Sequence, residues 1–224
     1  SLSGGEMLRN LCKTTLMLGL IFCIIVIIGI VGCAPKTPED IFTTAQNVLN
    51  SLESYAATIC YRVMDGQEER EYRFKQWVTM PSSFKIQLID EDNGVGKTIV
   101  SDGHRMVIDN PKIGDSLELE VDSLEQQRPL FIGDFLRLYW MAEEAEKKIH
   151  VDEGVEYVIF TCPFSNADLS RGSQELWLRS PKMVPSRMIT YDENNEITSI
   201  IIFEDFDGSW KADEDFYQTS NLEV

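Results

Sequence analysis

The side chains that could carry out chemistry in this sequence are few. It contains two histidines, His104 and His150, on segments predicted to be different strands, and neither has a Cys, Asp or Glu beside it at ligand spacing. A metal site needs three or four such ligands that converge. The sequence also lacks a nucleophile elbow, a zinc-binding helix motif and a glycine-rich phosphate loop. We therefore expect no catalytic residue, no metal and no cofactor.

Acidic residues are abundant, and two carboxylates can act together as the acid and base of a glycosidase. Glu118 with Glu120 and Glu143 with Glu144 are such pairs. Glycosidase carboxylates are brought together by the fold, so the sequence leaves a hidden pair open. In the segment Leu-Glu-Leu-Glu-Val, however, alternation puts Glu118 and Glu120 opposite the apolar residues, which favours a solvated strand face.

Two of the five cysteines, Cys60 and Cys162, lie in the predicted body of the protein. Alternation places Cys60 on a strand face with Thr58 and Arg62, and Cys162 on an apolar face with Phe160. Because side chains on opposite sides of one sheet cannot be bridged, we expect no intramolecular disulfide, a buried thiol at Cys162 and an accessible one at Cys60. Outside the cytoplasm an accessible cysteine can pair with another chain. Cys60 could therefore crosslink a homodimer, or stay an unpaired, partly covered thiol.

A basic and then apolar segment precedes the body. Basic residues are followed by an uncharged run, residues 14–31, which is the order of a secretory signal. That run is also about long enough to span a bilayer, so a retained membrane helix is the alternative. The tetrapeptide Ile30-Val31-Gly32-Cys33 resembles the bacterial lipobox. The resemblance implies diacylation of the Cys33 thiol and cleavage after Gly32, and two acyl chains anchor a protein stably.

These features predict the organisation of the chain. We expect a removed signal peptide (1–32), a lipidated tether (33–37), a single domain (38–217) and a tail (218–224). The length of the body suits one domain. The net charge of -17, from 37 acidic against 20 basic residues, argues against nucleic acid as a partner, because binding to phosphates needs a basic surface.

The body has the pattern of one large antiparallel sheet with two helices. Thr37-Pro38-Glu39-Asp40 combines a capping residue, a proline for the first helical position and acids for the positive end of the dipole. From Tyr55 the apolar period is two, with turn signals between the segments, which predicts about six strands. Residues 129–146 predict an apolar helix, and further strands follow it. The acidic, aromatic tail from Asp207 is expected to cap the sheet edge.

The order of these elements resembles the LolA/LolB superfamily of lipoprotein carriers. The resemblance rests on the capped helix, the consecutive hairpins, Ser101-Asp102-Gly103 before an apolar strand, and Trp177 to Pro185 before an Asp-Glu-Asn-Asn turn. It covers most of residues 38–206. It implies an α+β, mainly β fold in which a strongly curved antiparallel sheet, an incomplete β-barrel, wraps around helices and encloses an apolar cavity. Within this superfamily the sequence is most similar to the lipid-anchored GerS-like germination lipoproteins.

Two functions stay open at this point. The GerS-like resemblance implies a non-catalytic lipoprotein, held outside the cytoplasm on the cell or spore membrane, that supports a cortex peptidoglycan hydrolase or another germination protein through a sheet edge and an acidic surface. The alternative is a LolB-type receptor that binds an acyl chain, with the helix near Gly133 as a lid. Aromatic residues could line that cavity or fill it as ordinary core: Trp77, Phe131, Phe135, Trp140 and Trp177.

Overall fold

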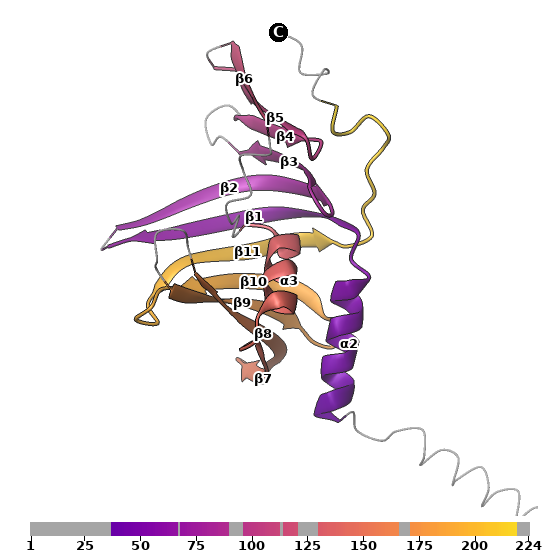
Figure 1. Cartoon of the computed structure of the whole chain (residues 1–224), viewed down its shortest axis with the longest axis vertical. Helices are drawn as coiled ribbons and strands as arrows, with labels where there is room; N and C mark the ends of the chain where they lie inside the picture. The colour runs from indigo at the N-terminus through magenta and orange to yellow at the C-terminus, as the bar shows by residue number, and fades with distance from the viewer. Residues whose placement is uncertain are drawn as a thin grey trace, which may run out of the picture. The chain divides into compact units, whose positions relative to one another are not determined.

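A computed structural model describes residues 37–66, 68–89, 96–112, 114–120, 130–165 and 171–218 of the chain (Figure 1). The predicted signal peptide, the cleavage site at Gly32 and the lipidation site at Cys33 lie outside the described residues. Residues 219–224 of the predicted tail lie outside them as well. The residues from Ile41 onward form one compact unit.

The first described helix, α2 (Pro38–Asn50), begins where the sequence predicts it. The Thr37 hydroxyl accepts a hydrogen bond from the Asp40 backbone N–H at 3.2 Å, and the Asp40 carboxylate accepts from the Thr37 backbone N–H at 3.0 Å. This reciprocal arrangement satisfies two N–H groups that a helix start leaves unpaired. Further along the helix, Ala45 and Leu49 are buried in the core.

Within the described residues, eleven strands form a single curved and unclosed sheet in which every neighbouring pair is antiparallel. The spatial order is β6-β5-β4-β3-β2-β1-β11-β10-β9-β8-β7, so two meanders are joined where the first strand pairs with the last. The bounds are β1 (Ser54–Asp65), β2 (Glu68–Thr79), β3 (Ser83–Leu88), β4 (Thr98–Ser101), β5 (Arg105–Asn110), β6 (Asp115–Glu120), β7 (Glu146–Asp152), β8 (Val155–Ser165), β9 (Arg171–Arg179), β10 (Val184–Tyr191) and β11 (Ile197–Asp207).

The predicted fold class, an α+β protein dominated by a curved antiparallel sheet, is confirmed by this strand order. The six strands expected before the second helix are all present. The second helix, α3 (Ile132–Met141), is shorter than the predicted 129–146, and the chain forms β7 from Glu146. The prediction was wrong at the C-terminal end of this helix. The charged residues there form part of an edge strand, and such a strand shows little apolar periodicity in the sequence.

One face of the sheet, called the inner face here, packs with both helices to form the main core. Alternation along β2 buries Phe74 and Val78 on this face. Ile132, Phe135 and Tyr139 of α3 join the same core, and α3 packs against β8 and β9. A buried amide ties the start of α3 to the sheet, because Gln76 accepts from the Tyr55 hydroxyl and its Nε2 donates to the Leu130 carbonyl. The opposite side of the sheet is called the outer face.

Candidate functional site

The five aromatic residues predicted to line an acyl-chain cavity do not lie together. Phe131 and Phe135 are 7% and 1% exposed in the main core, where Phe131 packs on the Phe84 ring at 4.8 Å between centroids. Trp140 is 54% exposed. Trp77 contacts Phe216, and Trp177 belongs to a cluster on the outer face. The structure therefore does not bring the five aromatic residues together in one cavity.

The physical reason is the two-residue period of a strand. Leu176 and Leu178 belong to the main core, so Trp177 between them points to the other side of the sheet. Phe74 and Val78 place Trp77 there in the same way. The two-residue alternation of apolar residues in the sequence already indicated the face on which each tryptophan lies.

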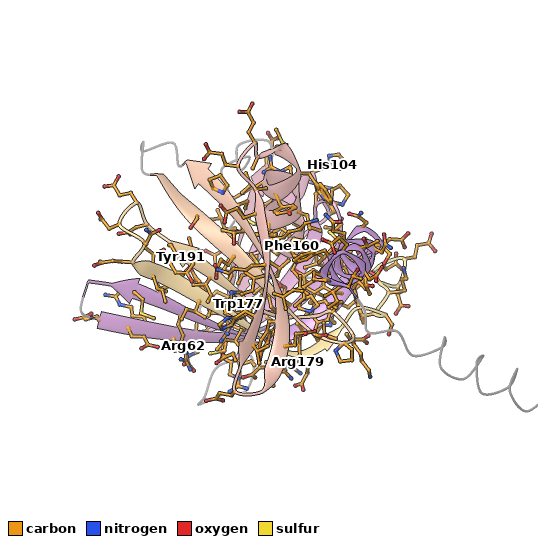
Figure 2. All side chains as sticks on the ribbon, turned by 90° about the horizontal axis from the view of Figure 1, so that it is seen from below. Arg62, His104, Phe160, Trp177, Arg179 and Tyr191 are labelled. Atoms are coloured by element: carbon orange, nitrogen blue, oxygen red, sulfur yellow. The ribbon has the colours of Figure 1, made fainter. Side chains whose placement is uncertain are left out.

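A second apolar cluster lies on the outer face over the strands β8 to β11, and we call it the Trp177 cluster. Its buried members are Tyr157, Ile159, Trp177 and Ile189, with Val155, Tyr191 and Ile200 packed against them. Trp177 and Tyr191 are labelled in Figure 2. The strands supply these residues by alternation with the residues of the main core.

A buried carboxylate, Glu175, holds the Trp177 cluster together. It is 7% exposed. Its Oε1 accepts from Lys148 Nζ at 2.8 Å, and its Oε2 accepts from Trp177 Nε1 at 2.8 Å and from the Tyr191 hydroxyl at 3.2 Å. Burial and the neighbouring Glu175 charge raise the pKa of Tyr191 to about 12. With three donors satisfied, this carboxylate fixes side chains from three strands and is not a free acid or base.

An arginine lies on top of this cluster. The guanidinium of Arg187 is 3.8 Å from the centroid of the Trp177 ring and 5.4 Å from that of Tyr157. Its Nη2 pairs with Asp152 Oδ2 at 3.2 Å, whereas its buried Nε has no acceptor in the described part of the chain. The ring of His150 meets Trp177 edge to face at 5.4 Å, so this histidine makes a packing contact.

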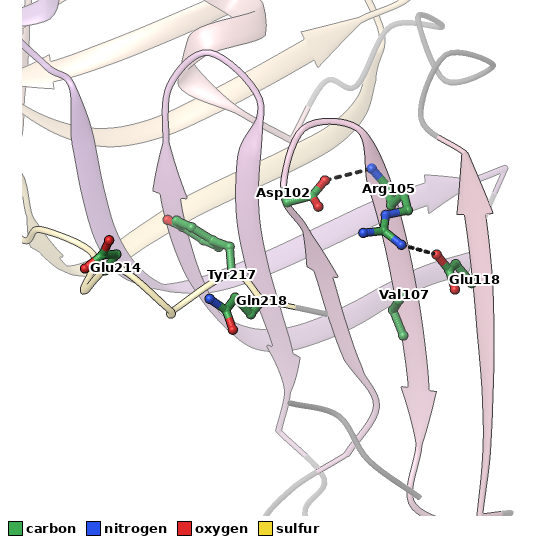
Figure 3. Close-up of a pocket in the computed structure, with 7 residues that line it drawn as sticks. All are labelled: Asp102, Arg105, Val107, Glu118, Glu214, Tyr217 and Gln218. Carbon is green, nitrogen blue, oxygen red and sulfur yellow. Dashed lines mark hydrogen bonds and ion pairs between the residues drawn. The ribbon is translucent and has the colours of Figure 1, made fainter. Parts of the chain in front are cut away.

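A polar pocket of about 370 Å³ opens elsewhere, beside β5 and β6 (Figure 3). The Asp102 carboxylate accepts from the backbone N–H groups of His104 and Arg105 at 2.8 Å each. Burial opposes ionisation of Asp102, but these N–H donors and the nearby Arg105 charge outweigh it and lower the pKa of the carboxyl. The Arg105 side chain pairs with Glu118 at 3.3 Å. The charges of Asp102, Arg105 and Glu118 are thus satisfied within the pocket, and Glu214, Tyr217 and Gln218 complete its lining.

The C-terminal segment lies across the outer face at β2 and β3. Phe216 meets Trp77 with 5.9 Å between ring centroids, Lys85 Nζ lies 5.1 Å from the Phe216 centroid, and the Tyr217 and Thr79 hydroxyls are 3.0 Å apart. The same segment reaches the edge strand β6, because Glu214, Tyr217 and Gln218 line a pocket together with Glu118. The expectation that it caps this edge stays a prediction.

Cys60 and Cys162 are both free and both buried. Cys162 belongs to the main core, as predicted, and burial raises its pKa to about 12. Cys60 lies on the other face, but the expectation that its thiol is accessible is wrong, because the residue is only 4% exposed. The side chains of Arg62 and Glu71 lie beside the Cys60 thiol, and burial raises its pKa. The intermolecular disulfide at Cys60 stays a prediction, and it would require this cover to move.

The described ranges of the chain contain no group of three or more His, Cys, Asp or Glu side chains arranged to hold a metal ion. They also contain no helix of sufficient length and apolar character to cross a membrane.

Comparisons with known proteins give the following findings. Residues 12–217 match a family model described as "Sporulation protein YdcC-like". No curated protein matches the chain. Among solved structures, the chain is similar to a chain of the CwlD amidase–GerS lipoprotein complex from Clostridioides difficile, with 20% identity, 78% of this chain and 98% of that chain covered, and a TM-score of 0.41. It is also similar to the LolA superfamily protein NE2245 from Nitrosomonas europaea, with 11% identity, 84% and 100% covered, and a TM-score of 0.41.

Proposed function

The chain belongs to the YdcC-like family of sporulation proteins, and from this premise we propose that it is a membrane-anchored, non-catalytic lipoprotein that supports a cell-wall hydrolase in spore germination. The family match is the observation that carries the proposal, since it spans the N-terminal segment and almost the whole domain. The anchor is the diacylated Cys33, on the sequence grounds given above. The protein would act outside the cytoplasm, on the cell or spore membrane.

The packing of the inner face supports a scaffold over a carrier. Phe135 is buried and stacks near Tyr139, and Tyr139 meets Phe160 of β8 edge to face at 5.3 Å. These rings occupy the space between α3 and the sheet in which an acyl chain would lie. A carrier would need to displace them, at a cost in buried apolar contacts.

We choose an amidase as the hydrolase because the GerS lipoprotein was solved in complex with the CwlD amidase. The corresponding amidase of the producing organism is the partner to test. Deletion of the gene should leave spores that form but fail to degrade their cortex, and the wild-type gene should restore cortex hydrolysis. Normal germination of the deletion strain would overturn the proposal.

A second experiment separates the scaffold from the acyl-chain receptor. Native mass spectrometry of the protein purified from membranes should show the mass of the lipidated chain without an additional lipid. A stoichiometric bound lipid would favour the receptor instead.

A further inference from the structure

The last turn of α3 exposes two large apolar side chains to solvent. Trp140 is 54% and Met141 is 75% exposed, whereas Ile132, Phe135 and Tyr139 of the same helix are buried in the main core. These two neighbouring positions therefore lie outside the apolar stripe with which the helix packs on the sheet. We call Trp140 and Met141 the Trp140 patch.

The Trp140 patch lies near the edge strand β7 and the first part of α2. The Trp140 ring meets Tyr139 at 5.5 Å between centroids, and Tyr139 meets Phe160 at 5.3 Å. Phe160 is directly paired with Lys147 of β7. The Lys147 ammonium in turn lies 4.9 Å from the centroid of the Phe42 ring, which α2 supplies. A short series of contacts thus connects the patch to α2, and Figure 1 shows α2 and β7 at the same end of the domain.

The first part of α2 cannot lie far from the predicted membrane anchor. Cys33 precedes Pro38, the first residue of α2, by five positions. A fully extended chain spans at most about 3.6 Å per residue, which is about 18 Å over this tether. Phe42 follows about one helical turn later. A retained membrane helix over residues 14–31 would likewise place the bilayer just before α2.

We propose that the Trp140 patch contacts the lipid bilayer and orients the domain on the membrane. This rests on the membrane anchor of the proposed function. Tryptophan is favoured at the membrane–water interface, because its ring is apolar and its N–H is polar. The anchor already holds the domain close to the bilayer, so a second contact forms at a high effective concentration. The anchor therefore supplies the affinity, and the patch sets the orientation.

The charges around the patch indicate an apolar contact rather than an ionic one. The segment 137–147 contains three exposed carboxylates, Glu143, Glu144 and Glu146, and two exposed cations, Arg137 and Lys147. Attraction to anionic lipid needs a cluster of basic residues. The contact should therefore form on phosphatidylcholine alone.

The test uses the full-length lipidated chain in phosphatidylcholine vesicles in which part of the lipid carries bromine on its acyl chains, a quencher of tryptophan fluorescence. All four tryptophans lie in the described ranges, and Trp140 is the exposed one among them. Brominated lipid should quench the wild-type protein, and Trp140→Phe should lower this quenching about threefold or more. Phosphatidylglycerol in the same vesicles should not increase it.

A second variant and a matched control test the patch without removing the fluorophore. Met141→Glu places a charge in the contact, which is costly in lipid, and should also lower the quenching. Leu117→Glu is the control, because Leu117 is 55% exposed on β6, the opposite edge strand of the sheet. It should leave the quenching at the wild-type level. Unchanged thermal unfolding of each variant distinguishes a lost contact from a lost fold.

The outcomes separate the anchor from the patch. A wild-type protein that does not float with the vesicles would overturn the membrane anchor and this inference together. A protein that floats but is not quenched, or whose quenching survives in Trp140→Phe, would leave the anchor in place and overturn the inference. Quenching that requires phosphatidylglycerol would indicate an ionic contact and overturn the apolar one. If the protein is not quenched and Met141→Glu weakens dimerisation or binding to the cortex amidase, the patch is a protein contact and the inference is wrong.

Discussion

Arg187 and Trp177 are directly paired across β10 and β9, and the guanidinium lies 3.8 Å from the centroid of the indole. The indole is itself fixed, because its Nε1 donates to the buried carboxylate of Glu175 at 2.8 Å. A cation held over an aromatic face is stabilised by the ring quadrupole. The position of the arginine on the outer face is thus set by its ion pair with Asp152 and, through the indole, by the Glu175 carboxylate.

The first prediction concerns that carboxylate. Glu175→Gln should lower the free energy of unfolding by about 1–3 kcal/mol, since an amide has one oxygen for three donors and its own N–H groups face them. Urea unfolding at neutral pH measures the change. Glu146→Gln is the control, because Glu146 lies in a row with Glu175 but is exposed. Equal stability of the two variants would show that Glu175 does not organise the cluster.

The second prediction concerns pH. The pKa of Tyr191 in the folded protein is raised to about 12, above its ordinary value of 10.0. The unfolded chain therefore loses this proton first as the pH rises. The contribution of Tyr191 to stability should be complete below pH 10 and should be lost between about pH 10 and pH 12. Tyr191→Phe should be less stable than wild type at pH 8 yet lose less stability over this range. Urea unfolding from pH 8 to pH 11.5 measures the free energy of unfolding of both proteins. An equal loss of stability in wild type and Tyr191→Phe would contradict this assignment.

The fold could be predicted to a large extent because its signals are local. Thr37 and Asp40 cap α2 as their spacing indicates, and the two-residue alternation from Tyr55 marks the strands. The strand around His150 was expected, but the start of β7 at Glu146 fell within the predicted helix, because Lys147 and Lys148 lie on an edge and give no apolar pattern.

The site was harder to predict because residue type does not determine which face a residue lies on. Trp77 and Trp177 look like cavity residues by composition, yet each lies on the outer face. The accessibility of Cys60 depends on its neighbours across the sheet: Arg62 and Glu71 lie beside the thiol, and Arg73 and Ile202 flank it on the adjacent strands.

The third prediction tests the filled inner face. Phe135→Ala should lower the free energy of unfolding by about 3–5 kcal/mol, because the ring is fully buried and its removal leaves a cavity. Trp140→Ala, on the same helix but 54% exposed, should change it by about 0.5 kcal/mol or less. Similar small effects in both variants would indicate an inner face with room for a ligand.

The fourth prediction concerns the thiols of the domain. Cys60 and Cys162 are both buried and their pKa values are raised by burial, and the thiolate is the reactive form. Neither should react with Ellman's reagent in the native protein at pH 7, and both should react in guanidinium. Comparison of Cys60→Ser with wild type under native conditions isolates Cys60. Rapid reaction at Cys60, or a disulfide dimer that Cys60→Ser abolishes on a non-reducing gel, would show that Arg62 and Glu71 do not keep it covered.

The last prediction concerns the anchor, which rests on the sequence alone. If Cys33 is the lipidated residue, Cys33→Ala removes both the thiol that is acylated and the substrate of the cleavage step. The variant should then take up no labelled palmitate and should either keep residues 1–32 or be released from the membrane. Cys23→Ala is the matched control, because Cys23 follows Phe22 and lacks the small residue that Gly32 provides before Cys33. Palmitate labelling that survives in Cys33→Ala but not in Cys23→Ala would assign the lipid to Cys23 instead. A wild-type chain that is not cleaved would favour the retained membrane helix.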